Sequence, residues 1–435
     1  MSELFIITDI VQASAFVFLR FWWLWTFFIL VLILPFLWLA YVQEYWKKSL
    51  KYVLLELKMP LEVRKSPRAM EQVFQLLHSL SGGPANIEEK WWDGEVIPWY
   101  SCELVSFGGE IHFYMRVPKK HRNMIEASLY AHYADIHISE VPDDYINRLP
   151  PTYGDLKKEG YELFGNELIL AKPDAYPIRT YVDFEEKEEE HQLDPMGNLL
   201  EVLTKAKPQE ILWLQIIVRM NEGEWAREAE KLVDALKAKA AKTPLLTETG
   251  TTVYTTAAWG EVEVMKAVSR NITKSGFDTV IRYVYISPKP IHDTNFGQRA
   301  IHTALNQYAS QAFNKFKHNY AAWTRASIWI FPHLFPKMRK RARQERIYWN
   351  YRRRHMYSET IVGALLESKW YHFGLGARES SKMVLNTEEL ATIFHPPTIA
   401  VQTGPLIKRV EARKVGPPAG LPIYGEEGEG LPGIK

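Results

Sequence analysis

The polarity pattern along the chain begins with a long apolar segment. From Phe21 to Val42, FWWLWTFFILVLILPFLWLAYV, 22 residues carry no charge. As a helix rising about 1.5 Å per residue, this segment would reach roughly 30 Å, the thickness of the hydrocarbon core of a bilayer. A signal peptide is shorter and ends at a small-residue cleavage site, which does not follow here. The many tryptophan and phenylalanine residues also favour a membrane over a globular core. The pattern therefore predicts a transmembrane helix over about 21–42.

The charges on either side of the apolar segment predict its orientation. The preceding flank contains Glu3, Asp9 and Arg20, and the apolar residues before Arg20 extend the span or lie along the interface. The following flank is basic and contains Lys47, Lys48, Lys51 and Lys58. Because positively charged flanks stay in the cytoplasm, we expect the N-terminus outside the cell. The bulk of the chain would then be cytoplasmic, held by a single pass in the inner (plasma) membrane.

After the span, alternating and helical patterns follow in the order β-α-β-β-α-β. The elements are a strand at 51–59, a helix at 66–83, strands at 100–107 and 110–118, a helix at 119–135 and a strand at 136–142. Ser66 followed by Pro67 is typical of a helix start, and Gly108-Gly109 is typical of a hairpin turn. This order predicts a ferredoxin-like, or split βαβ, module over 49–150.

The same order recurs over 151–330 with larger insertions. The elements are a strand at Ile178–Phe184, a helix at 194–207, a strand at 210–220, helices at 224–242 and 256–275, a strand at 277–287 and a helix at 295–313. Asp194 suits the N-cap of its helix. We therefore predict an α+β protein with two ferredoxin-like modules, the second of which carries a helical insertion.

Composition and motifs exclude several functional classes. The 435 residues carry a formal net charge of only +2, so information about charged partners has to come from local clusters. The single cysteine, Cys102, excludes an internal disulfide framework and a thiolate metal cluster. The sequence contains no G-x-x-x-x-G-K-[ST], H-E-x-x-H or G-x-S-x-G motif. It thus predicts a protein that is not an enzyme and needs no cofactor or metal.

The region 331–356 is strongly basic. The segment KMRKRARQERIYWNYRRRHM contains nine Lys or Arg residues and one Glu, with aromatic side chains between them. Such a segment can bind phosphate backbones while the rings stack on bases. Near a membrane it can instead bind anionic lipids, and it can also form a protein contact or a solvated face. The candidate nucleic-acid or lipid-binding residues are Lys337, Arg339, Lys340, Arg341, Arg343, Arg346, Arg352, Arg353 and Arg354.

A short helix signal lies between Val384 and Thr398. Asn386 suits an N-cap, and Glu389, three residues later, completes a capping box. Leu390 and Phe394 follow at helical spacing, and two prolines then end the helix. We expect a docking helix, with Asn386, Glu389, Leu390 and Phe394 as candidate partner-docking residues. The tail 399–435 is rich in proline and glycine, which is typical of a linker.

Three segments resemble a known family. GEIHFYMRVPKKHRNMIEASLYAHYADIHISEV, EELATIFHPP and RVEARKVGPPAGLP resemble the N-terminal, non-ATPase regions of membrane-anchored HerA/FtsK-type ATPases from candidate-phyla bacteria. These ATPases act as coupling proteins in type IV secretion or conjugation. The resemblance covers most of 50–422, and its motifs are diffuse. In the family, the capped helix and the proline-rich stretch lead into an ATPase domain with a Walker motif, whereas this sequence ends at Lys435.

The resemblance implies a place in a DNA or protein export machine. The expected parts are an anchor at 1–48, modules at 49–150 and 151–330, a basic stretch and docking helix at 331–398 and a tail at 399–435. The leading hypothesis is a non-enzymatic membrane subunit of a type IV secretion or conjugation-like machine. It would be a homo-oligomer in contact with membrane lipid, a platform for a separate HerA/FtsK-type ATPase, and DNA would be a further partner. The alternative is a membrane-tethered nucleic-acid-binding module that uses 337–354.

Overall fold

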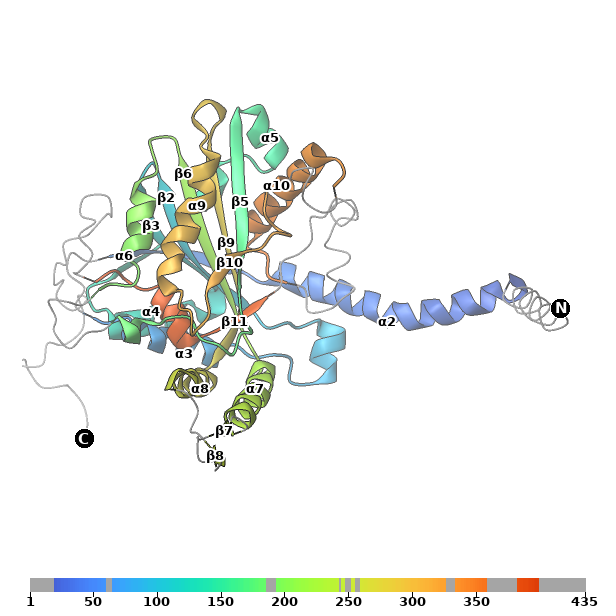
Figure 1. Cartoon of the computed structure of the whole chain (residues 1–435). Helices are drawn as coiled ribbons and strands as arrows, with labels where there is room; N and C mark the ends of the chain where they lie inside the picture. The colour runs from blue at the N-terminus through green and yellow to red at the C-terminus, as the bar shows by residue number, and fades with distance from the viewer. Residues whose placement is uncertain are drawn as a thin grey trace, which may run out of the picture.

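One antiparallel sheet of nine strands runs through the part of the chain that the computed structural model describes (Figure 1). That part comprises residues 19–59, 65–184, 193–241, 244–246, 252–254, 259–325, 333–357 and 382–398. The sheet strands are β1 Tyr52–Lys58, β2 Trp99–Phe107, β3 Glu110–Pro118, β4 His137–Glu140, β5 Tyr161–Leu170, β6 Ile211–Met220, β9 Gly276–Pro288, β10 Phe316–His318 and β11 Met383–Asn386. The mixed α+β class predicted from the sequence is confirmed.

The helices fill the connections between the strands. They are α2 Trp22–Ser49, α3 Arg68–Leu80, α4 Arg122–His132, α5 Tyr153–Lys158, α6 Gly197–Thr204, α7 Glu224–Ala241, α8 Trp259–Ile272, α9 Thr294–Leu305, α10 Pro336–Arg353 and α13 Thr387–Ile393. Short turns of helix include η1 Glu89–Asp93, η2 Lys119–His121, η3 Tyr145–Arg148, η4 Tyr181–Asp183, η6 Lys289–Ile291 and η7 Asn306–Tyr308. The small hairpin β7 Pro244–Leu246 and β8 Thr252–Tyr254 lies between α7 and α8.

The strand order has the same form in both halves of the sheet. The full order is β10-β5-β9-β6-β2-β3-β1-β4, and β11 pairs with one end of β9. In each half the fourth strand lies beside the first, followed by the third and the second. The halves meet where β2 pairs antiparallel with β6, from Trp99↔Arg219 to Phe107↔Ile211. Both predicted regions therefore belong to a single continuous sheet.

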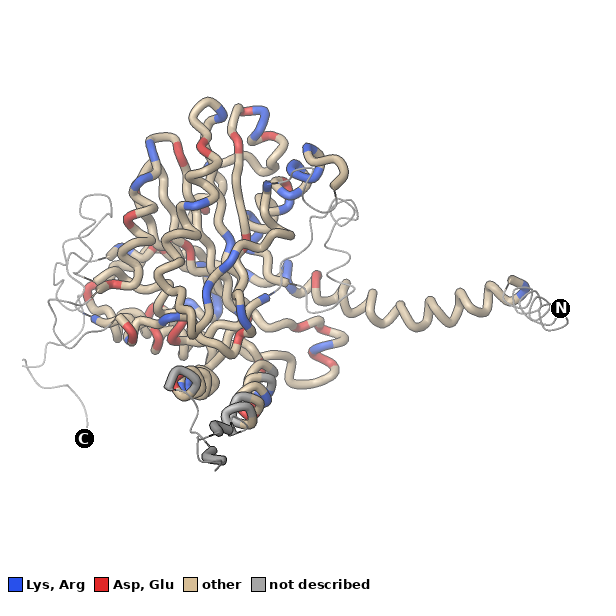
Figure 2. Tube along the Cα trace, viewed as in Figure 1, with Lys and Arg blue, Asp and Glu red and all other residues tan. Residues whose placement is uncertain are grey.

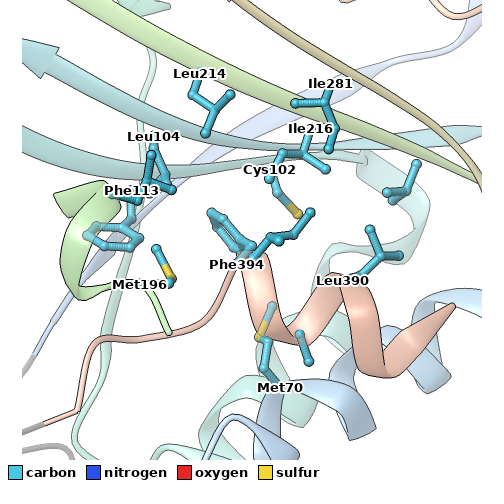
Figure 3. Close-up of a cluster of buried hydrophobic side chains, with 14 of the residues drawn as sticks. Met70, Cys102, Leu104, Phe113, Met196, Leu214, Ile216, Ile281, Leu390 and Phe394 are labelled. Atoms are coloured by element: carbon cyan, nitrogen blue, oxygen red, sulfur yellow. The ribbon is translucent and has the colours of Figure 1, made fainter. Parts of the chain in front are cut away.

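Alternating side chains give the sheet two covered faces. On one face, α3, α4, α6, α9 and α13 cover the larger core. Figure 3 shows part of it, with Met70 and Phe394 beneath Cys102, Leu214 and Ile281 of the sheet. On the other face, α10, α5 and η3 cover a smaller core rich in aromatic rings. Burial on both faces is the reason that β6 is a nearly continuous apolar run in the sequence.

The predicted hairpin at Gly108-Gly109 is confirmed. β2 and β3 pair in register from Ser101↔Arg116 to Phe107↔Glu110. Gly108 and Gly109 have φ angles of 56° and 93°. Two consecutive positive φ angles are what a tight two-residue hairpin requires, and glycine adopts them without a steric penalty.

The predicted strand at Ile178–Phe184 is wrong. That segment contains the helical turn η4, which is capped by Thr180, whose backbone N–H donates to Asp183. The first strand of the second half is instead β5, which pairs with β9 from Tyr161↔Pro288 to Leu168↔Ile281. No element was predicted for this segment, which has Gly165 in its middle. A Cβ there would lie 3.1 Å from Ile347 of α10, so the glycine permits a close helix–sheet approach.

Among the described residues, α2 is the one helix long and apolar enough to cross a membrane. It projects away from the sheet in Figure 1, and in Figure 2 most of its length carries no charged residue. Its apolar side chains are exposed as far as Trp38, whereas Leu39, Ala40 and Val42 are buried. So large an exposed apolar surface is typical of contact with lipid.

Candidate juxtamembrane site

The inner end of α2 is fixed to the globular part through η1. The indole N–H of Trp38 donates to the carbonyl oxygen of Trp91 at 2.8 Å, and the rings of Trp38 and Trp92 lie 6.0 Å apart. Gly94 has a φ of 71°, and a Cβ at this position would lie 2.4 Å from the carbonyl carbon of Val42. The backbone after η1 therefore packs directly against the backbone of α2.

The η1 segment also presents an apolar side chain beside α2. Trp92 is 73% exposed. Because its ring lies 6.0 Å from that of Trp38, this side chain lies beside the last lipid-exposed turn of the helix. Tryptophan is enriched at this depth in membrane proteins, where its ring is apolar and its N–H is polar.

The basic stretch predicted from the sequence forms α10 and its C-terminal cap, and its charges are divided between interior and surface. Arg339, Arg343, Arg346 and Arg354 are buried. The Arg343 guanidinium, for example, donates to the carbonyl oxygens of Trp323 and Arg325 at 3.0 and 3.1 Å. The remaining members are half-buried Arg352 and exposed Lys337, Lys340, Arg341 and Arg353. The nine predicted residues therefore do not form one basic surface.

Arg354, the C-cap of α10, places its guanidinium against the face of the sheet that α10 covers. Arg354 has a φ of 49° and reaches Glu103 of β2 through two contacts, Nε–Oε1 at 2.6 Å and Nη2–Oε2 at 2.9 Å. It also donates to Asp144, and the Tyr145 hydroxyl donates to Glu103 at 2.7 Å. Burial by itself would raise the pKa of Glu103, but the charge and hydrogen bonds of Arg354 lower it below its ordinary value.

Glu103 continues into a row of buried polar side chains across four strands. In register, Glu103 lies opposite Gln215, Gln215 opposite Arg282, and Arg282 opposite Glu167. Gln215 donates to Glu103 at 3.0 Å, and Arg282 pairs with Glu167 at 3.0 Å. Arg282 also donates to the carbonyl oxygen of Asn350 in α10. Sequence reasoning missed this row, because its members are far apart in the chain and only strand pairing aligns them.

A cavity of about 970 Å³ lies beside this network. It is bounded by the end of α2, by β1 and β3, and by the last turn and cap of α10. Its lining includes Lys47, Lys48, Arg116, Trp349, Arg353 and Arg354. The fold thus brings the lysines that follow the span together with the last arginines of the basic stretch.

The predicted capping box at the start of α13 is confirmed. The Asn386 side chain accepts from the Glu389 N–H at 2.8 Å, and Glu389 accepts from the Asn386 N–H at 2.9 Å. None of the four predicted docking residues (Asn386, Glu389, Leu390 and Phe394) exposes more than 3% of its surface. Their side chains hold α13 to the core, so a partner that docks here has to contact other residues.

A family model described as a domain of unknown function, DUF8128, matches residues 55–407. The chain belongs to the DUF8128 family. No curated protein matches the chain. The DUF8128 match begins within β1 and extends past α13, so it takes in both halves of the sheet and leaves α2 outside. Among the described residues of the chain, no cluster of three or more His, Cys, Asp or Glu side chains could hold a metal ion.

Proposed function

We propose that this DUF8128 protein is a membrane-anchored, non-enzymatic subunit of a type IV secretion or conjugation-like translocation machine. Its DUF8128 region would be the assembly platform for a separate HerA/FtsK-type ATPase, in a homo-oligomer. The observation that carries the proposal is the fixed junction between α2 and the sheet, made by the Trp38–Trp91 hydrogen bond and the Gly94–Val42 contact. A span joined in this way holds a globular body at a set height above a membrane.

The platform would consist of two ferredoxin-like modules. The support is the order β4-β1-β3-β2 in one half and β10-β5-β9-β6 in the other, all antiparallel. A split βαβ module has a strand order of this form. Pairing of β2 with β6 would make the two modules a single rigid unit. The hairpin and helices between β6 and β9 would be an insertion into the second module.

The DUF8128 region would face the cytoplasm, with the N-terminus outside. Lys47 and Lys48 follow the apolar part of α2, and basic residues favour the cytoplasmic side. A single cysteine placed ahead of the span and another on the globular surface would test this in intact cells. We expect an impermeant maleimide to label only the cysteine ahead of the span. Labelling of the surface cysteine alone would show that the orientation is the opposite of the one proposed.

Affinity purification of the full-length protein in mild detergent tests the partnership. We expect a Walker-motif ATPase among the co-purifying proteins, identified by mass spectrometry. Purification of the protein without any ATPase, from cells that contain one of the HerA/FtsK type, would overturn the platform hypothesis. Resistance to alkaline extraction from membranes would show in parallel that the protein is inserted.

Testing whether the tail binds the ATPase requires a truncation that leaves the fold intact. Because α13 is buried, a chain cut before residue 384 would lose core residues such as Leu385 and Leu390. Deletion of 408–435 keeps α13 and the whole matched region. We expect this variant to insert in the membrane but to lose the ATPase. Full retention of the ATPase would remove the tail from the interface.

The surface of α10 favours a second candidate, a membrane-tethered nucleic-acid-binding module. Lys337, Lys340 and Arg341 are exposed at the N-terminal end of the helix. Binding through them would weaken steeply with salt, because phosphate neutralisation releases counterions. Replacing these three residues by alanine would lower both the affinity for nucleic acid and the salt dependence of that affinity. Absence of salt-sensitive DNA or RNA binding by the full-length protein would remove this candidate.

A further inference from the structure

The juxtamembrane cavity carries more positive than negative charge. Six of its lining residues are Lys or Arg, and three are Asp or Glu. The three carboxylates are paired within the fold, Glu44 with Lys47, Glu140 with Arg122, and Asp144 with Arg354. Buried Glu103 likewise forms an ion pair with Arg354. These carboxylates therefore leave an excess of positive charge in the lining.

Four of the lining cations, Lys48, Arg116, Arg352 and Arg353, have no carboxylate within 4.0 Å in the described part of the chain. Arg352 instead donates to the carbonyl oxygens of Ile146 and Leu149, which leaves Lys48, Arg116 and Arg353 as the three candidates for binding an anion. The Arg116 guanidinium lies 3.6 Å from the centre of the Tyr52 ring, and that of Arg353 lies 4.4 Å from the Trp349 ring. Stacking of this kind fixes the plane of a guanidinium while leaving its N–H groups available for an anion.

Arg116 is the innermost of the three. It projects from β3 and is partly buried. Burial and the neighbouring charge of Arg354 lower its pKa to about 10, so it is still protonated at neutral pH. A charged group held away from water without an ion partner is unfavourable, and a bound anion relieves that cost. A guanidinium group can form a bidentate pair with phosphate oxygens, so a phosphate is a suitable anion for Arg116.

The position of the cavity along α2 indicates where its ligand comes from. The part of α2 that lines the cavity runs from Glu44 to Lys48, two to six residues after Val42, the last residue of the apolar segment. At about 1.5 Å per residue, this part lies roughly 3–9 Å beyond the apolar segment. The polar layer on each side of a bilayer is roughly 5–8 Å thick. If α2 spans a membrane, the cavity therefore overlaps the layer of lipid headgroups.

We propose that this cavity binds the phosphate-bearing headgroup of an anionic membrane lipid. Arg116 contacts the phosphate from inside, and Lys48 and Arg353 contact it at the rim, while the acyl chains lie along the apolar part of α2. The proposal requires that α2 span a membrane but does not require an ATPase partner. A volume of about 970 Å³ is sufficient for a headgroup of this size.

The test measures thermal unfolding of the detergent-purified full-length protein with added short-chain lipids. The arms are phosphatidylglycerol, phosphatidylcholine of the same chain length, and inorganic phosphate or glycerol 3-phosphate. We expect phosphatidylglycerol to raise the Tm saturably and the other arms to have little effect. An equal response to phosphatidylcholine would overturn the proposal. A response to inorganic phosphate at the same concentration would indicate a soluble ligand and overturn the assignment to lipid.

Matched variants distinguish the cavity from the basic helix as a whole. Arg116→Gln removes the inner cation, and Arg341→Gln removes one charge from exposed α10 outside the cavity. We expect Arg116→Gln to weaken the apparent affinity for phosphatidylglycerol at least about tenfold and Arg341→Gln to leave it unchanged. Equal weakening by the two variants would mean non-specific attraction and would overturn the proposal.

A second pair of variants keeps the test decisive if Arg116→Gln does not fold. Lys48 and Arg353 are both exposed, so the double variant Lys48→Gln/Arg353→Gln leaves the interior unchanged. Its control is Lys337→Gln/Arg341→Gln, which has the same change in charge. Retention of full lipid response by the first double variant would overturn the proposal. ATPase co-purification is scored separately on the same variants, so that the lipid site and the platform hypothesis can fail independently.

Discussion

At the scale of single residues, Glu389 combines a local and a non-local role. One carboxylate oxygen accepts from the Asn386 N–H within the capping box, and the other accepts from the Ile178 N–H at 2.9 Å. The side chain is fully buried, and Glu388 and Asp174 lie nearby. Burial raises its pKa to about 8, although the two backbone N–H groups act in the opposite direction. The sequence predicted the first contact and could not have predicted the second.

We expect Glu389 to make stability depend on pH. Its pKa in the folded protein is above the ordinary value of 4.5, so the folded state favours the protonated form. The stability that this preference contributes is present below about pH 4.5 and is lost as the pH rises towards about 8. Thermal unfolding at several pH values should show this loss, and Glu389→Gln should reduce it. Glu201→Gln, a change at an exposed helix residue, is the control; identical pH profiles for all three proteins would contradict the prediction.

The Arg354–Glu103 pair gives a second prediction at this scale. Glu103→Ala leaves the buried guanidinium with Asp144 alone, and removing one partner of a buried ion pair costs about 3–5 kcal/mol. The contact with Asp144 favours the lower end of this range. Glu345→Ala breaks the exposed pair with Arg341 and should cost less than about 1 kcal/mol. Denaturant unfolding measures both, and equal costs would refute the assignment of Glu103 to a buried pair.

At the scale of elements, α10 differs most from its sequence-based interpretation. Its charge pattern indicated a solvated or ligand-binding helix, yet Ile347, Tyr348 and Tyr351 pack against the sheet. The buried side chains of Arg339 and Arg343 face inward. They donate hydrogen bonds to the backbone carbonyl oxygens of Leu334 and Trp323, respectively. A run of arginines is therefore compatible with burial when backbone acceptors surround it. The aromatic residues at helical spacing were the signal in the sequence that the charges obscured.

The junction between α2 and η1 depends on Gly94. Gly94→Ala should separate the two elements, because its Cβ would overlap the Val42 backbone and its positive φ disfavours any other residue. We expect a loss of about 1–3 kcal/mol and faster proteolysis near η1. Gly82→Ala is the matched control, since a Cβ there meets no atom within 4 Å. Equal protease sensitivity in the two variants would show that the junction does not depend on this contact.

At the scale of the whole molecule, the β2–β6 seam joins the two halves. Seven of the nine residues of β2 are buried, and Glu103 at its centre pairs with Arg354, about 250 residues away in the sequence. We therefore expect a fragment of residues 49–150 not to unfold cooperatively, and residues 49–398 to do so. Circular dichroism during thermal unfolding compares the two. A sharp transition in the short fragment would mean that the first half is an independent domain.

The sequence by itself determined the features that depend on neighbouring residues. The apolar length of α2, the Gly108-Gly109 turn and the Asn386–Glu389 capping box need only a few consecutive side chains, and all three were predictable. β5 was not predicted, and the close approach of its Gly165 to Ile347, far along the chain, leaves no local signal in the sequence. Tertiary structure alone decided which arginines are buried, joined the halves at β2–β6 and placed Arg116 beside Lys48 and Arg353. These features depend on pairing and burial between distant segments, which local periodicity does not encode.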